Sequence, residues 1–180
     1  FGASFAMLMW FWIQHRRWSR RYGLENQATI LTSLALMFVM LVYVYPLRMI
    51  FEGMFSQLSG GYLETTYEID TFDDLRLIFI FYAAGFVAMS LLVSQLYRMA
   101  LRSGAQLGLN DVETRRTRVE MHTWAIAAGF GVMSSTVAFT VPDYLVPLAG
   151  YLYFALFPAM LVPAYLDRRR HSPQVRASGS

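Results

Sequence analysis

Residues 28–51 of the chain read ATILTSLALMFVMLVYVYPLRMIF, an apolar run in which Arg48 is the one charged residue. An α-helix needs about 20 predominantly apolar residues to cross the hydrocarbon core of a bilayer. The run therefore predicts a transmembrane helix. Arg48 stands near the end of this helix, where its long side chain can reach the headgroups.

Apolar runs of the same kind recur along most of the chain. Residues 1–14 are also apolar but too few to cross, so we expect a partial span that begins upstream of Phe1. The prediction is an all-α fold, a polytopic transmembrane helix bundle over residues 1–167, followed by a basic, disordered tail at 168–180. The four complete spans are predicted at about 28–51, 75–97, 121–141 and 144–166.

The composition supports a membrane protein. Of the 180 residues, 56% are hydrophobic and 15% are charged, whereas soluble domains are about 45–50% apolar and about 25% charged. All 15 basic residues are arginine. They cluster beside the apolar runs, which indicates membrane orientation and disfavours nucleic-acid binding. The chain has no cysteine, which excludes thiolate nucleophiles and cysteine metal sites.

The charges between the spans alternate in sign. Residues 15–27 carry four arginines against one glutamate, and residues 98–120 carry five arginines against three acidic residues. Residues 52–74 carry six acidic residues and no arginine, while the turn at 142–143 contains one aspartate. Because arginine concentrates on the cytoplasmic side, the two arginine-rich connections and the C-terminal tail are predicted to be cytoplasmic. The partial helix then begins outside, so six spans are expected in the complete protein.

The histidines leave two interpretations open. His15 and His122 stand at the same predicted membrane face, where they could ligate a haem in a redox protein. The simpler interpretation is that each forms hydrogen bonds at the interface. No third ligand is spaced to complete a zinc site, so neither a metal nor a cofactor is expected. The middle of every predicted span lacks charged residues and histidine, which disfavours a proton-coupled transporter.

Small residues gather in the predicted span at 121–141. Gly129, Gly131, Ser134 and Ser135 could allow close helix packing, as small residues do in membranes. Alternatively, the hydroxyl groups could line a polar path. The Gly-Phe-Gly sequence is only a fragment of a dinucleotide fingerprint, and no phosphate-binding loop or hydrolase serine motif occurs. An enzyme is therefore not expected.

Three of the prolines inside predicted spans are singled out as kink positions, namely Pro46, Pro158 and Pro163. Proline removes one backbone hydrogen bond and clashes with the preceding turn, so a kink is expected at each position.

One stretch has a specific sequence pattern in addition to its apolar composition. Residues 11–18 read FWIQHRRW at the end of an apolar helix, and they are followed by Asn26 and by a long helix that closes with Tyr45-Pro46. This pattern resembles the second and third helices of the transmembrane protein 175 family, the bacterial and lysosomal potassium channels. The tight turn Val141-Pro142-Asp143 and the basic tail are similar in outline to the end of that family's fold.

The resemblance implies a specific function. Family members have six helices per repeat, and the bacterial ones form tetramers around a pore lined by apolar side chains of the first helix. Trp12 and His15 would belong to a polar cluster that braces the Phe-Ser-Asp motif of that helix and would not bind the ion. No Phe-Ser-Asp occurs among the 180 residues, so we expect the motif on an upstream helix. The implied location is the bacterial plasma (inner) membrane.

Three functions are therefore compared. The leading hypothesis is a potassium-permeable cation channel subunit in a homotetramer, with a hydrophobic pore constriction that needs neither a charged ring nor a carbonyl filter. Its partners would be the potassium ion, the lipid bilayer and further copies of the chain. The alternative is a non-conducting scaffold or accessory subunit of a larger membrane complex. A haem- or quinone-associated redox protein using His15 and His122 is the least favoured.

Overall fold

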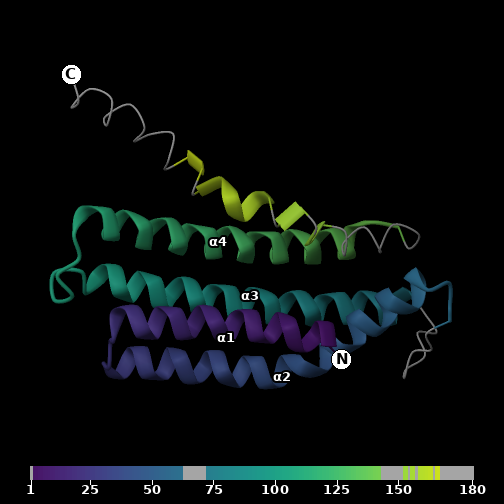
Figure 1. Ribbon diagram of the computed structural model, residues 1–180. Helices are drawn as coiled ribbons and strands as arrows, with labels where there is room; N and C mark the ends of the chain where they lie inside the picture. The colour runs from purple at the N-terminus through teal and green to yellow at the C-terminus, as the bar shows by residue number, and fades with distance from the viewer. Residues whose placement is uncertain are drawn as a thin grey trace.

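The computed structural model describes residues 2–62 and 72–142, together with most residues between 152 and 166. The four helices run side by side in the order α1 (Gly2–Tyr22), α2 (Gln27–Leu58), α3 (Phe72–Arg102) and α4 (Asp111–Thr140). α3 contacts α4, α2 and α1, and the last described residues lie along α4 (Figure 1). No strand occurs among the described residues. The predicted all-helical bundle is therefore confirmed.

α1 extends well beyond its apolar part. The helix continues through the four arginines that the sequence predicted for a connection and ends at Tyr22. Arginine is a good helix former, so the change from apolar to charged residues does not end the helix. Gly23 ends it: this residue has φ of 54°, and its N–H bonds to Ser19 O at 3.0 Å. A left-handed residue of this kind, usually glycine, is a common helix terminator.

α2 also exceeds its predicted span. Asn26 caps its first turn, because the Asn26 Oδ1 accepts a hydrogen bond from Thr29 N at 2.9 Å. Pro46 lies inside the helix, which bends in its second half (Figure 1). Arg48 forms an ion pair with Glu52 one turn further along. The helix therefore continues into the first part of the predicted acidic connection.

α4 begins ten residues before its predicted span, at Asp111 instead of 121. A capping box sets this start: Asn110 Oδ1 accepts from Glu113 N at 2.9 Å, and Asn110 N donates to Glu113 Oε2 at 3.2 Å. The arginines at 115, 116 and 118 consequently lie on the first turns of a helix and not in a loop.

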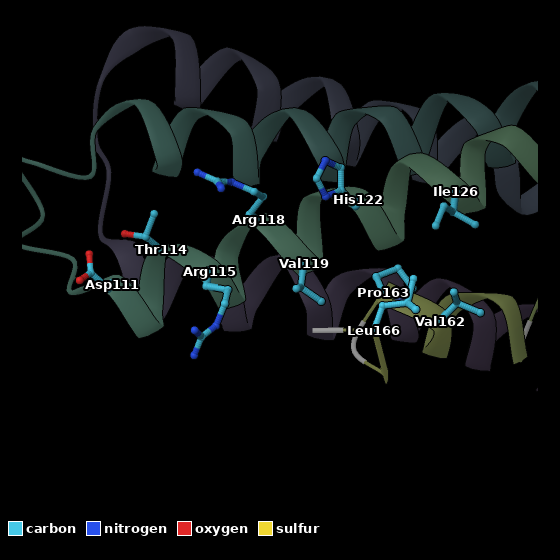
Figure 2. Close-up of a pocket in the computed structure, with 10 residues that line it drawn as sticks. All are labelled: Asp111, Thr114, Arg115, Arg118, Val119, His122, Ile126, Val162, Pro163 and Leu166. Carbon is cyan, nitrogen blue, oxygen red and sulfur yellow. The ribbon is translucent and has the colours of Figure 1, made fainter. Parts of the chain in front are cut away.

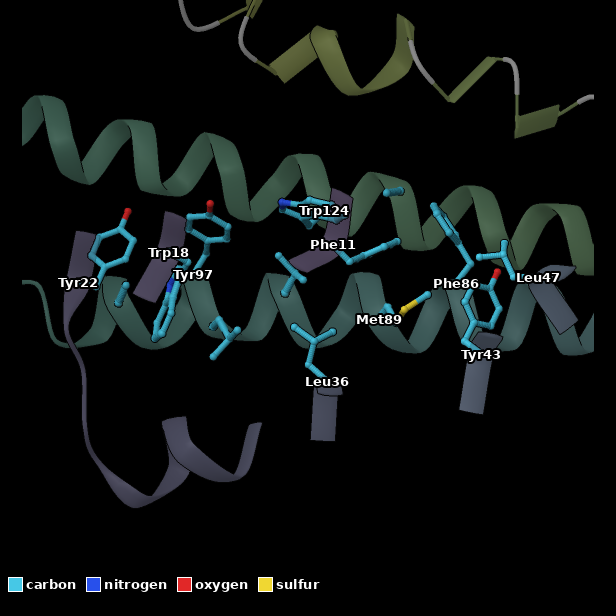
Figure 3. Packing of buried hydrophobic residues seen from close by; sticks show 14 of the residues in the cluster. Phe11, Trp18, Tyr22, Leu36, Tyr43, Leu47, Phe86, Met89, Tyr97 and Trp124 are labelled. Atoms are coloured by element: carbon cyan, nitrogen blue, oxygen red, sulfur yellow. The ribbon is translucent and has the colours of Figure 1, made fainter. Parts of the chain in front are cut away.

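The core is formed mainly by α3 together with the helices on either side of it. Phe11 of α1 packs on Trp124 of α4 at 5.3 Å between ring centroids and edge-to-face on Phe86 of α3 at 6.0 Å (Figure 3). Met89 and Leu36 are fully buried in the same cluster. Each helix therefore contributes side chains to one continuous apolar core.

Two glycines permit close helix approach. A Cβ atom on Gly85 of α3 would lie 2.5 Å from Tyr43 Cε2 and closer still to Tyr43 Cδ2. A Cβ atom on Gly131 of α4 would lie 2.5 Å from Val87 Cγ2. Contacts this short are impossible without movement. Gly85 therefore allows α2 to approach α3 closely, and Gly131 allows α4 to approach α3 closely.

The last predicted span is described in part. Tyr153 packs edge-to-face on Tyr82 and Phe86 of α3, at 4.9 and 5.3 Å between centroids. Pro158 and Pro163 both lie in helical residues. Residues 143–151 and the tail at 168–180 lie outside the described residues, so the predicted turn and tail stay predictions.

Three described helices, α2, α3 and α4, are long and apolar enough to cross a membrane. Much of their apolar surface faces outward, as at Leu41, which is 74% exposed. A bilayer can cover this surface because lipid chains are as apolar as the side chains.

Candidate functional site: the aromatic and polar seam of α1

One face of α1 buries polar side chains within the bundle. Gln14 and His15 are both buried, and His15 is 8% exposed. The Nε2 atom of His15 lies 3.0 Å from Ser33 Oγ of α2, a hydrogen bond whose donor depends on the imidazole tautomer. A buried polar group needs such a partner, since leaving it unpaired costs free energy. The bond therefore joins α1 to α2.

Aromatic rings continue from His15 toward the end of α1. The His15 ring stacks on Trp18 at 6.5 Å between centroids, and Trp18 packs on Tyr22 at 5.7 Å. Tyr22 meets Tyr97 of α3 edge-to-face at 6.2 Å (Figure 3). Spacings of three and four residues place these side chains on one helix face. We call this set of four rings with Ser33 the α1 seam.

The seam reaches α4 through a hydrogen-bond chain. The Thr117 hydroxyl donates to Glu113 O at 2.7 Å, one turn earlier in α4. The Tyr22 hydroxyl lies 2.7 Å from Thr117 Oγ1 and donates to it, because the threonine proton is already engaged. Thr117 is fully buried. The end of α1 is thus fastened to the first turns of α4.

The two tryptophans around His15 differ in environment. Trp12, which the sequence pairs with His15, packs against its ring at 5.9 Å but is 40% exposed. Trp18 is 2% exposed and lies on the buried side of the same helix. The sequence reasoning did not single out Trp18. Its spacing of three from His15 and four from Tyr22 is the signal that could have found it.

The small residues of α4 do not share one face. Gly131 lies against α3 and Ser134 is buried, whereas Gly129 is exposed and has nothing within 4 Å of where its Cβ would be. Ser135 donates to Gly131 O within its own helix at 3.2 Å. At 3.6 residues per turn, two residues of separation place Gly129 nearly opposite Gly131.

Arg76 forms a contact that the sequence reasoning missed. From the start of α3, its Nη1 donates to Ala138 O at 3.0 Å and to Phe139 O at 3.3 Å, and its Nη2 donates to Val141 O at 2.8 Å. The last carbonyls of a helix have no partner within the helix, and a cation there is favourable. Arg76 therefore caps the C-terminus of α4.

The two histidines have different neighbours. His15 faces Ser33 in the α1 seam, whereas His122 lines a cavity beside the last described residues (Figure 2). Within the described part of the chain, no group of three histidine or carboxylate side chains could hold a metal ion. The two imidazoles therefore do not share a site, as a haem held by both would require.

The arrangement is that of a polytopic α-helical membrane protein. It has close glycine contacts between helices, an apolar outer surface and hydrogen bonds from His15 and Tyr22 that join α1 to neighbouring helices. No protein-family model matches the chain. A protein of Marivirga tractuosa named "Potassium channel" is 30% identical over 173 residues, which cover 90% of this chain and 69% of that protein. A crystal structure of a variant of the potassium channel MtTMEM175, in complex with a nanobody–MBP fusion protein, superposes with a TM-score of 0.80 at 26% identity. The match covers 93% of this chain and 76% of the other.

The chain belongs to the transmembrane protein 175 family of potassium channels. The family resemblance found in the sequence is confirmed. Membership of a channel family also confirms that the chain is not an enzyme.

Proposed function

We propose that the chain is a subunit of a membrane channel that conducts potassium ions. The observation that carries the proposal is the identity of 30% with a protein named as a potassium channel, over 69% of that protein. The fold agrees, because the helices superpose with those of a second potassium channel at a TM-score of 0.80.

The α1 seam fits a supporting role in such a channel. His15 and Tyr22 use their polar atoms on Ser33 and Thr117, so these groups hold α1 in register with α2 and α4. A side chain committed to an interhelical hydrogen bond is poorly suited to bind a passing ion. We therefore assign His15, with Trp12 and Trp18 beside it, to positioning the helices.

A homotetrameric assembly is part of the proposal. The family resemblance implies a homotetramer, and the exposed apolar side chains of α2 would then divide between lipid and neighbouring subunits. Phe38 and Leu41 are examples, at 67% and 74% exposed. The constriction would be hydrophobic, since a dewetted apolar ring can gate without charged groups.

The proposed location is the bacterial plasma (inner) membrane with the C-terminus in the cytoplasm. The arginines at the ends of α1 and α3 and at the start of α4 support this orientation. The alternative of a non-conducting scaffold is not favoured, because the similar proteins are named as potassium channels.

Potassium efflux from proteoliposomes tests the proposal. Purified full-length protein is reconstituted into vesicles loaded with potassium chloride, and efflux is followed after dilution into an impermeant cation. We expect flux above that of empty vesicles, and greater for potassium than for sodium. Equal flux from protein-containing and empty vesicles, both releasing potassium fully on addition of an ionophore, would contradict channel function.

Mass measurement in mild detergent tests the assembly. A homotetramer gives about four times the mass of a single subunit. A stoichiometric complex with a different protein would instead favour the scaffold.

A further inference from the structure

A cavity of about 610 Å³ lies between α4 and the described residues of the last predicted span (Figure 2). Its α4 wall is one helix face, on which Arg115, Arg118, His122 and Ile126 recur at intervals of three or four residues. α4 packs on α3 through a different face, which contains the buried Trp124. The residues of α4 that line the cavity are therefore not the ones that pack against α3.

One end of the cavity is suited to a phosphate group. Arg115 and Arg118 line it together with the Thr114 hydroxyl and the His122 ring. One carboxylate, Asp111, also lines this end, so the fixed charges sum to one positive charge. A guanidinium group presents two parallel N–H donors that match two phosphate oxygens. The polar end therefore favours a negatively charged phosphate group over a neutral group.

The other end is apolar. It is lined by Ile126 of α4 and by Val162 and Leu166 of the last described residues. Along α4, Ile126 stands roughly 16 Å beyond Arg115 at 1.5 Å per residue. The predicted start of the apolar span, residue 121, falls between them. The cavity therefore passes from the expected headgroup level into the hydrocarbon, and a free phosphate would use only its polar half.

We propose that this cavity binds an anionic phospholipid, with its phosphate held by Arg115 and Arg118 and the start of one acyl chain lying along Ile126, Val162 and Leu166. The site is independent of whether the protein conducts potassium. It adds a lipid-binding site on the side of α4 that faces away from α3.

Lipid titration with native mass spectrometry tests the site. Phosphatidylglycerol and phosphatidylcholine with identical acyl chains are added separately to the detergent-solubilised protein, and bound lipid is counted. We expect phosphatidylglycerol, which has a net negative charge, to bind at least about tenfold more tightly, because the trimethylammonium group of phosphatidylcholine is repelled by the arginines and offsets the attraction of its phosphate. The variant R115Q/R118Q should lower its affinity to that of phosphatidylcholine.

The matched control is R102Q/R116Q, which removes two charges from exposed positions of α3 and α4 outside the cavity. It should bind phosphatidylglycerol as the unchanged protein does. An equal loss in the control would show general surface charge and overturn the site. If R115Q/R118Q does not fold, R118Q alone carries the test, because Arg118 is exposed.

Two further measurements separate the sources of the phosphate. Excess inorganic phosphate should leave phosphatidylglycerol bound, and I126S should lower the affinity for phosphatidylglycerol. Complete displacement by inorganic phosphate, with no effect of I126S, would identify a site for soluble phosphate and refute the lipid proposal. Equal binding of the two lipids would refute it as well.

Discussion

Replacing Gly85 by alanine should destabilise the protein, although alanine is the better helix former. The new Cβ would lie 2.5 Å or less from two ring atoms of Tyr43. This ring is buried, and its hydroxyl donates to Tyr82 O at 2.8 Å. Overpacking of this kind costs about 1–3 kcal/mol, and loss of the hydrogen bond adds about 1 kcal/mol. The gain in helix propensity returns about 0.8–1.0 kcal/mol.

The expected net loss for G85A is therefore about 1–3 kcal/mol. Thermal unfolding in detergent, followed by tryptophan fluorescence, measures it. G129A is the matched control, because a Cβ at Gly129 meets nothing within 4 Å and should leave stability unchanged or raise it. Adding Y43L to G85A removes the clash, so the double variant should lose less than the sum of the two single variants. A G85A protein as stable as G129A would refute the reasoning.

Three more substitutions test the contacts that join the helices. S33A leaves the buried Nε2 of His15 without its partner and should cost about 1–3 kcal/mol in thermal unfolding. R76Q removes the cap on the last carbonyls of α4 and should cost about 1–2 kcal/mol, with faster amide exchange at that helix end. Y22F removes the donor to Thr117 but leaves the threonine bonded within α4, so about 1 kcal/mol or less is expected.

Each of these variants has a control that makes the same chemical change at an exposed position. S19A is the control for S33A, R98Q for R76Q, and Y45F for Y22F. Losses as large in the controls as in the test variants would show that the contacts described here do not contribute specifically.

The sequence alone predicted the helical spans and the class of protein. An apolar run long enough to cross a bilayer must satisfy its backbone internally, so residues 28–51 could hardly be anything but a helix. The family resemblance also followed from local residues, those at 11–18 and Pro46. The helix ends were less accurate, because helices continue through arginine and glutamate until a cap or a glycine stops them, as Asn110 and Gly23 do here.

The tertiary structure decided which face of each helix matters. The family resemblance singled out Trp12 beside His15, whereas Trp18 is buried because of the way α1 packs against its neighbours, which the sequence does not specify. Sequence reasoning also grouped Gly129 with Gly131, although only Gly131 lies against α3. Arg76 illustrates the same reason at longer range: its role depends on carbonyls 62 or more residues away, which only the packing of α3 against α4 brings within hydrogen-bond distance.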